Sequence, residues 1–286
     1  MGSILVGIDG STRGRRALDW AVRFARVTGD DIAMIAVIDE AIANKAGVSV
    51  DTVRETVSHA LEEKRQSALK SYPDMRIEDS VAVGDIVGVL ADSAAEHSMI
   101  VLGSHHGHTI GETIGGAKGL RVSVSTSVPT VVVPADWDAD EQAEGIVVGV
   151  GPDEAVSAGA IDFGARASML LHQPLELISA WGVPAWLERT AQTMGGGLAP
   201  VGQQRQRELD RQLVRLACEY PGALKVTGRT IEGASPSRVL VEASANASML
   251  VMGTNSRSAL GRTLFGSVTH SVLLNLTVPT VIVPQV

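Results

Sequence analysis

Short apolar runs alternate with longer amphipathic stretches along the whole chain. Continuous apolar runs of this length are typical of strands that are buried on both faces. They lie at residues 4–8, 32–38, 77–83, 99–102, 130–133, 146–150, 175–180, 249–252 and 280–283. The run at 77–83 is more polar than its neighbours, which predicts a strand nearer a sheet edge.

The stretches between these runs carry apolar residues at helical spacing. In the first of them, Ala17, Leu18, Ala21, Val22 and Ala25 share one stripe, with Trp20 and Phe24 beside it as core residues. Further helices are predicted from Asp51 to Tyr72-Pro73 and within 87–94, 160–167 and 203–218. Strands that alternate with helices predict βαβ units and a parallel sheet, which is an α/β fold.

One pattern occurs twice in the chain. Gly253 and Gly266 follow Gly103 and Gly116 by the same 150 positions, and Val-Pro-Thr-Val recurs at that offset too. We therefore expect two copies of one domain, at residues 1–134 and 146–286, joined by a short acidic linker at 135–145. The apolar, uncharged runs 130–133 and 280–283 would be edge strands, and we expect them to pair with each other within the chain.

Each repeated segment consists of a buried strand, a polar loop with glycines and the start of a helix. Such a loop forms a concave nest of backbone N–H groups above a positive helix end, which suits a phosphate. A Cβ atom there would hold the anion away from the amides or forbid a positive φ. If strands 4–8 and 99–102 are neighbours, Asp9 and Gly103 face each other across a crevice where parallel sheets bind ligands.

Composition narrows the classes of partner. The net charge of −8 argues against a nucleic acid or an anionic membrane. No apolar run approaches the ~18 residues that a membrane span needs, and because residues 4–8 already have the pattern of a strand, we expect no basic-then-apolar leader. Cys218 is the only cysteine, which excludes an intrachain disulfide and fits a reducing, cytoplasmic compartment. On its apolar-periodic helix, Cys218 is expected to be buried.

The chain resembles the universal stress protein family in its tandem two-domain form. The ATP-binding members of that family show Gly, two residues, Gly, nine residues and then Gly-Ser or Gly-Thr after the fourth strand, and Val-Asp-Gly-Ser after the first. The resemblance implies two tandem Rossmann-like (adenine nucleotide alpha hydrolase-like) domains. Each would be a five-stranded parallel sheet with helices on both faces. It also implies a stress-response regulator that binds ATP, ADP or AMP, with or without Mg²⁺, and forms a homodimer.

Each half matches the family motif with departures. In the second half Gly253, Gly266 and Ser267 match, but Ser256 replaces the middle glycine. In the first half Gly103 and Gly116 match, whereas His106 replaces the middle glycine and Ala117 replaces the hydroxyl residue. By resemblance, these loops contact the nucleotide phosphates.

The resemblance also implies contacts to the nucleoside. Asp9 would contact the ribose, but the second half has Gly151 at that place and Asp153 as its nearest carboxylate. The adenine contacts would fall on Gly7, Val37, Gly149 and Ala180. Because His is tolerated at positive φ better than Ser, and Lys118 can add a charge near the phosphates, we slightly favour the first half.

Plainer interpretations remain beside these. Gly103 and Gly116 can be turn and packing glycines, Asp9 can be only a helix N-cap, and Lys118 can be a solvated charge. The neighbouring His105, His106 and His108 lack the carboxylate or cysteine spacing of a metal site. A non-binding scaffold with degenerate loops is the alternative function. No general base or metal ligand set supports an enzyme, so a slow ATP hydrolase ranks below both.

Overall fold

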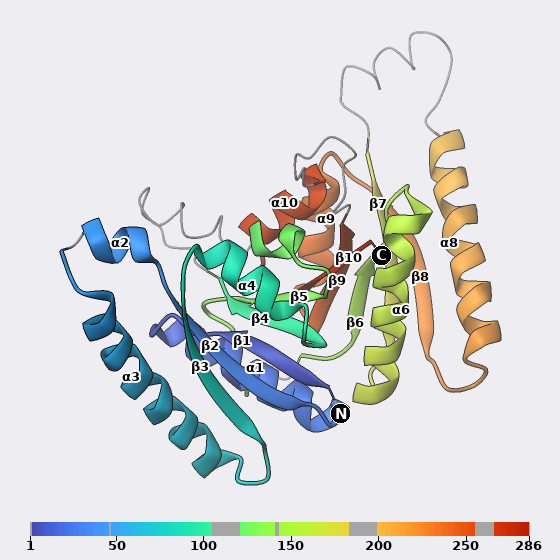
Figure 1. Ribbon diagram of the computed structural model, residues 1–286. Helices are drawn as coiled ribbons and strands as arrows, with labels where there is room; N and C mark the ends of the chain where they lie inside the picture. The colour runs from blue at the N-terminus through green and yellow to red at the C-terminus, as the bar shows by residue number, and fades with distance from the viewer. Residues whose placement is uncertain are drawn as a thin grey trace. The chain divides into compact units, whose positions relative to one another are not determined.

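The computed structural model describes residues 2–45, 47–104, 121–140, 143–182, 199–254 and 266–285. The chain divides into two compact units, Met1–Glu141 and Gln142–Val286, called unit 1 and unit 2 below. Figure 1 shows both as sheets covered by helices. Each unit is described by itself.

Unit 1 is built on a parallel sheet. Its strands are β1 (Ser3–Gly7), β2 (Asp31–Ile38), β3 (Ile77–Val83), β4 (Met99–Gly103) and β5 (Thr130–Val133), in the spatial order β3-β2-β1-β4-β5. The more polar β3 stands at the sheet edge, as its composition predicts. The chain winds outward from β1 through β2 to β3 and then crosses back to β4, which creates a switch point between β1 and β4.

The helices of unit 1 lie on both faces of this sheet. They are α1 (Thr12–Thr28), α2 (Glu40–Lys45), α3 (Val50–Ser71) and α4 (Ile86–Ala94). Right-handed crossovers place α1 and α3 on one face, and the reversed crossover after β3 places α4 on the other. There α4 packs its buried Val87, Leu90 and Ala94 against Leu5 and Ile35 of the sheet. The predicted stripe of α1 is buried against the opposite face, and Trp20 and Phe24 stack with ring centroids 5.1 Å apart.

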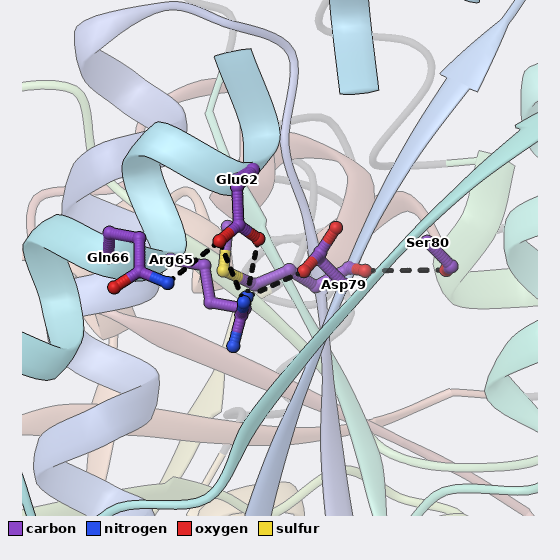
Figure 2. A network of polar contacts seen from close by, with 6 residues as sticks. Glu62, Arg65, Gln66, Asp79 and Ser80 are labelled. Carbon is purple, nitrogen blue, oxygen red and sulfur yellow. Dashed lines mark hydrogen bonds and ion pairs between the residues drawn. The ribbon is translucent and has the colours of Figure 1, made fainter. Parts of the chain in front are cut away.

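A polar network fastens α3 to the edge strand (Figure 2). Arg65 of α3 lies between Glu62 of the same helix and Asp79 of β3. Its Nε atom is 2.8 Å from Oδ1 of Asp79, and its Nη2 atom is 2.7 Å from Oε1 of Glu62. Hydrogen bonds from Gln66 and Arg65 lower the pKa of Glu62, and the bond to Glu62 raises the pKa of Arg65. Because α3 buries only Leu61 fully, this network supplements a thin apolar contact.

Unit 2 repeats the architecture of unit 1. Its strands are β6 (Ile146–Gly149), β7 (Leu175–Trp181), β8 (Val226–Glu232), β9 (Met249–Thr254) and β10 (Thr280–Pro284), in the order β8-β7-β6-β9-β10, all parallel. Its helices are α6 (Glu154–Leu171), α8 (Ala199–Glu219), α9 (Pro236–Ala243) and α10 (Ser267–Leu274). The matching strand orders confirm the tandem duplication that the sequence predicts.

Two local expectations need correction. Cys218 is exposed rather than buried. The buried stripe of α8 runs through Leu209 and Leu216, seven residues apart, and a position two residues beyond Leu216 points away from that stripe. In addition, the short helix α2 was not predicted, because six residues are too few to show helical periodicity.

The predicted linker is attached at its middle and at its end. In its middle, Arg23 of α1 donates to the carbonyl of Ala139 and pairs with Asp140 at 3.3 Å, within unit 1. Near its end, the carbonyl of Gly145 accepts from the backbone N–H of Ser248, within unit 2. The domain limits and the pairing of the two expected edge strands stay predictions. None of the helices that the structure describes is long and apolar enough to cross a membrane.

Candidate functional site

Both sheets have a switch point at equivalent places. In unit 1, β1 and β4 are neighbours, with Val6 paired to Val101. In unit 2, β6 and β9 are neighbours, with Gly149 paired to Met252. Open parallel sheets bind ligands outside the carboxyl ends of strands at such a point. A cavity lies at this place in each unit.

The cavity of unit 1 is small and mainly apolar. Its volume is about 130 Å³, and it brings together four of the predicted site residues, Gly7, Asp9, Val37 and Gly103. The side chains of Leu90 and Leu102 belong to its walls, as does that of Ile8. A Cβ atom at Gly7 would lie 2.6 Å from Leu102 Cδ2, so glycine here keeps the wall close-packed.

Asp9 organises the turn between β1 and α1. Its Oδ1 atom accepts hydrogen bonds from the backbone N–H of Ser11 at 3.0 Å and from the Ser11 hydroxyl at 2.5 Å. The N-cap of α1 is Ser11, whose hydroxyl oxygen accepts from the N–H of Gly14. The plainer interpretation of Asp9 as the N-cap is therefore wrong, because a better placed hydroxyl fills that position. The ribose contact of Asp9 stays a prediction.

The cavity of unit 2 is larger and more polar. Its volume is about 530 Å³, within the range of roughly 300–1,000 Å³ that is usual for small-molecule sites. It brings together five of the predicted residues, Gly149, Ala180, Gly253, Gly266 and Ser267. A ligand of nucleotide size therefore has room at the carboxyl ends of β6, β7 and β9.

Several predicted residues lie outside the described part of the chain. They are His106, Gly116, Ala117 and Lys118 of the first repeat and Ser256 of the second, together with His105 and His108. Their expected contacts stay predictions. Among the residues that the structure describes, no group of three or more His, Cys, Asp or Glu side chains could hold a metal ion.

Position 253 requires glycine because of close packing, and not because of its φ angle. A Cβ atom on Gly253 would collide with the carbonyl oxygen of Val156 in α6. Its φ does not lie in the left-handed region, and Gly266 has a φ of −60°. Of the two reasons expected for glycine in this loop, a positive φ therefore applies at neither position, and close packing explains Gly253. At Gly266 the nearest described atom to a Cβ would be Thr269 Oγ1 at 4.0 Å.

The start of α10 lies at the unit 2 cavity. Gly266 is the N-cap and supplies no side-chain hydrogen bond, and the first-turn residues Ser267, Val268 and Thr269 line the cavity. The first N–H groups of a helix have no acceptor within the helix, and its N-terminus carries a partial positive charge. The site therefore favours an anion in this part of the cavity.

Thr254, in the wall of the same cavity, has a buried and unsatisfied hydroxyl. It ends β9, lines the cavity and is only 2% exposed. Within the described part of the chain, its buried Oγ1 atom has no hydrogen-bond partner. A buried polar group without a partner costs about 1–3 kcal/mol, so a ligand group that reached this hydroxyl would remove that cost.

The carboxylate nearest to the predicted ribose position already has structural partners. Asp153 is the N-cap of α6, and its Oδ1 atom accepts from the N–H groups of Ala155 and Val156 at 3.0 and 3.3 Å. The N–H of Gly151 donates to the Ser157 hydroxyl at 3.0 Å. This turn is thus held by its own hydrogen bonds, as the equivalent turn of unit 1 is.

Among the residues that line the unit 2 cavity and that sequence reasoning missed are Thr254, Trp181 and Arg205. Thr254 directly follows the buried run of β9 and its glycine, so its position could have flagged it. Trp181 ends β7, one residue beyond the predicted strand. Arg205 comes from α8, and nothing in its surrounding sequence marks it, because only the packing of α8 brings it to the cavity.

Comparisons with known proteins agree with this architecture. Residues 1–134 and 144–284 each match the model of the Universal stress protein family. A universal stress protein of Mycolicibacterium smegmatis is 25% identical over 299 residues, which cover 98% of this chain and 96% of that relative. One of Mycobacterium tuberculosis is 25% identical over 304 residues, covering 99% of this chain and 97% of the relative.

A solved structure supports the same fold. The crystal structure of a universal stress protein from Archaeoglobus fulgidus aligns with a TM-score of 0.65 at 17% sequence identity. The alignment covers 99% of this chain and 96% of that one. The likeness confirms the tandem Rossmann-like α/β fold. Taken with the two family matches, it shows that the chain belongs to the universal stress protein family.

Proposed function

We propose that this protein is a stress-response regulator that binds an adenine nucleotide, ATP, ADP or AMP, in the cavity of unit 2. The observation that carries the proposal is the unpartnered, buried hydroxyl of Thr254 beside the uncapped N-terminus of α10. Together they supply donors for the phosphates, in a cavity of about 530 Å³ at the switch point. Bound nucleotide would then change the surface that the protein offers to its partners.

The difference between the cavities favours unit 2 over unit 1. The cavity volumes are about 530 and 130 Å³, and the smaller one has mainly apolar walls. The slight preference for the first half that the sequence suggests rests on His106 and Lys118, which lie outside the described residues. We therefore assign the nucleotide to unit 2. Any Mg²⁺ would arrive with the phosphates, which commonly supply part of its coordination.

A matched pair of substitutions tests both the binding and its place. Ser267→Asp puts a carboxylate at the first position of α10, where it is favourable for the helix but repels a phosphate. Ala117→Asp makes the same change at the equivalent position of the first repeat. We expect equilibrium dialysis with labelled ATP to show binding that is lost in Ser267→Asp and kept in Ala117→Asp. Absence of binding to the unsubstituted chain, or the opposite pattern, would overturn the proposal.

A non-binding scaffold is the second candidate. It is favoured by the role of Gly253, which the packing of α6 explains without any ligand. On this hypothesis the purified protein carries no nucleotide and its absorbance ratio at 260 and 280 nm is that of protein alone. Excess absorbance at 260 nm, removed by denaturation and filtration, would exclude it.

We also propose that the protein is a cytoplasmic homodimer. The lone, unpaired Cys218 supports a reducing compartment, and the family resemblance supports the dimer. Light scattering coupled to size-exclusion chromatography gives the test, because a homodimer has twice the chain mass of 29.9 kDa.

A further inference from the structure

A positively charged side chain from α8 reaches the cavity of unit 2. Arg205 lines this cavity together with Thr254 and the first turn of α10. The described residues that line the unit 1 cavity include no lysine or arginine. Among the described lining residues, the two cavities therefore differ by one positive charge, that of Arg205, as well as in volume.

The placement of Arg205 is fixed by the packing of its helix. Leu209 and Leu216 bury one stripe of α8 completely. One turn before Arg205, a Cβ atom on Gly202 would lie 2.9 Å from the Trp181 ring, so glycine lets α8 approach the end of β7 closely. Trp181 itself lines the cavity. The backbone that carries Arg205 is thus held against the wall of the site.

Arg205 forms an ion pair within its own helix, and this pair can be replaced by a contact with a ligand. Its Nη1 atom lies 3.1 Å from Oε2 of Glu208, three residues along the same helix. An ion pair within one helix does not attach α8 to the sheet, so its loss leaves the tertiary packing intact. Glu208 also accepts a hydrogen bond from Gln204 at 2.9 Å. It therefore keeps a partner when the guanidinium moves away.

A carboxylate in the described cavity wall is held by the backbone of α6 and not by Arg205. The wall also contains Asp153, whose Oδ1 atom is used by the N–H groups at the start of α6. Arg205, Thr254 and the first residues of α10 line one cavity, and each of them carries a hydrogen-bond donor. Such a set matches a ligand with several phosphate oxygens better than a neutral one.

We propose that Arg205 selects for charge in the unit 2 cavity: it exchanges Glu208 for a phosphate group of the bound nucleotide. Unit 2 then discriminates phosphorylated nucleotides from nucleosides. The inference rests on the proposed function and deepens it, since it names the residue that recognises the negative charge of the ligand. Charge-assisted hydrogen bonds between guanidinium and phosphate are about twice as strong as neutral ones, so one side chain is enough to set the preference.

Calorimetric titrations of the full chain with ATP, AMP and adenosine test this inference. In Arg205→Gln we expect ATP affinity to fall roughly tenfold or more, the loss typical of a charged hydrogen bond, while adenosine affinity is unchanged. Arg205→Lys should recover part of the loss. The matched control is Arg207→Gln, which removes the same charge from an exposed position of α8 and should bind as the unsubstituted chain does.

A second variant separates ligand binding from helix stability. Glu208→Gln removes the competing carboxylate, so ATP should bind more tightly although the helix loses an ion pair. Equal ATP affinity in Arg205→Gln, Arg207→Gln and the unsubstituted chain would overturn the role of Arg205 and leave the proposed function standing. A chain that binds neither ATP nor AMP would overturn both.

Discussion

The backbone of Gly253, at the end of β9, lies so close to the carbonyl oxygen of Val156 in α6 that no Cβ atom fits between them. This contact sets the separation between the helix and the strand that carries the candidate site. A glycine that a motif search would assign to phosphate binding is thus needed to assemble the unit.

Gly253→Ala should therefore destabilise the protein. Overpacking of this kind costs about 1–3 kcal/mol, so the midpoint of thermal unfolding should fall clearly. Gly266→Ala serves as the control, since its nearest neighbour would be 4.0 Å away and its φ of −60° suits any residue. Equal unfolding midpoints for the two variants, measured by circular dichroism, would contradict the packing role.

Thr254→Val should uncouple stability from binding. Because the buried hydroxyl has no partner among the described residues, valine removes an unsatisfied group of the same shape, and unfolding should need the same or a higher temperature. ATP affinity should nevertheless fall, by roughly tenfold if one hydrogen bond is lost.

The control for this pair of effects is Thr130→Val. Thr130 has the other buried, unpartnered hydroxyl of the described chain, at the start of β5 and outside both cavities described here. Its substitution should affect stability in the same direction and leave ATP binding unchanged. A Thr254→Val protein that binds ATP normally would show that the hydroxyl is not a ligand contact.

His97 should make unit 1 less stable in mild acid. Burial lowers its pKa below the usual value, with a smaller opposite effect from Glu96. The neutral ring lies with Nδ1 2.6 Å from the Ser3 hydroxyl. Because the unfolded chain takes up the proton at the ordinary pKa near 6.5, and the folded chain only at lower pH, stability is complete above about pH 6.5 and declines below it.

Substitution of this histidine gives the measurement. Between about pH 7.5 and about pH 5.5, on either side of that ordinary pKa, the unfolding midpoint should drop further in the unsubstituted chain than in His97→Gln. His59→Gln, at an exposed position of α3, should keep the full pH dependence. Parallel pH profiles for His97→Gln and the unsubstituted chain would exclude the effect.

Asp79→Asn should loosen α3 from the edge strand. It removes the contact that Figure 2 shows between Arg65 and β3, and it leaves the bonds between Arg65 and Glu62 in place. Partly exposed ion pairs contribute about 0.2–1 kcal/mol, so we expect a small loss of stability and faster hydrogen exchange in β3. Glu78→Gln, which affects only the exposed pair with Arg76, is the control.

The sequence predicts most of the fold because buried strands are recognisable as continuous apolar runs. The 150-residue offset between Gly103 and Gly253 predicts the duplication, and the order of the segments predicts the switch point. The edge position of β3 follows from its polarity. These features can be read directly from the pattern and order of apolar segments.

The site is less accessible to such reasoning because its residues come together from distant segments. Ser11, not Asp9, caps α1, and only the hydrogen bonds show which oxygen reaches the helix. Arg205 lines the cavity because of how α8 packs, and glycine is needed at position 253 because Val156 of α6 lies close to it. Each fact depends on a neighbour that is far away along the chain.

The inequality of the two cavities has a consequence for how the protein responds to its ligand. If unit 2 alone binds the nucleotide, as we propose, the chain takes up one equivalent and its saturation curve is hyperbolic despite the internal repeat. Steeper, sigmoidal uptake then requires coupling between separate chains. The repeat that carries the smaller cavity is free to diverge toward assembly or partner contacts, and the stoichiometry of a titration reports how far that specialisation has gone.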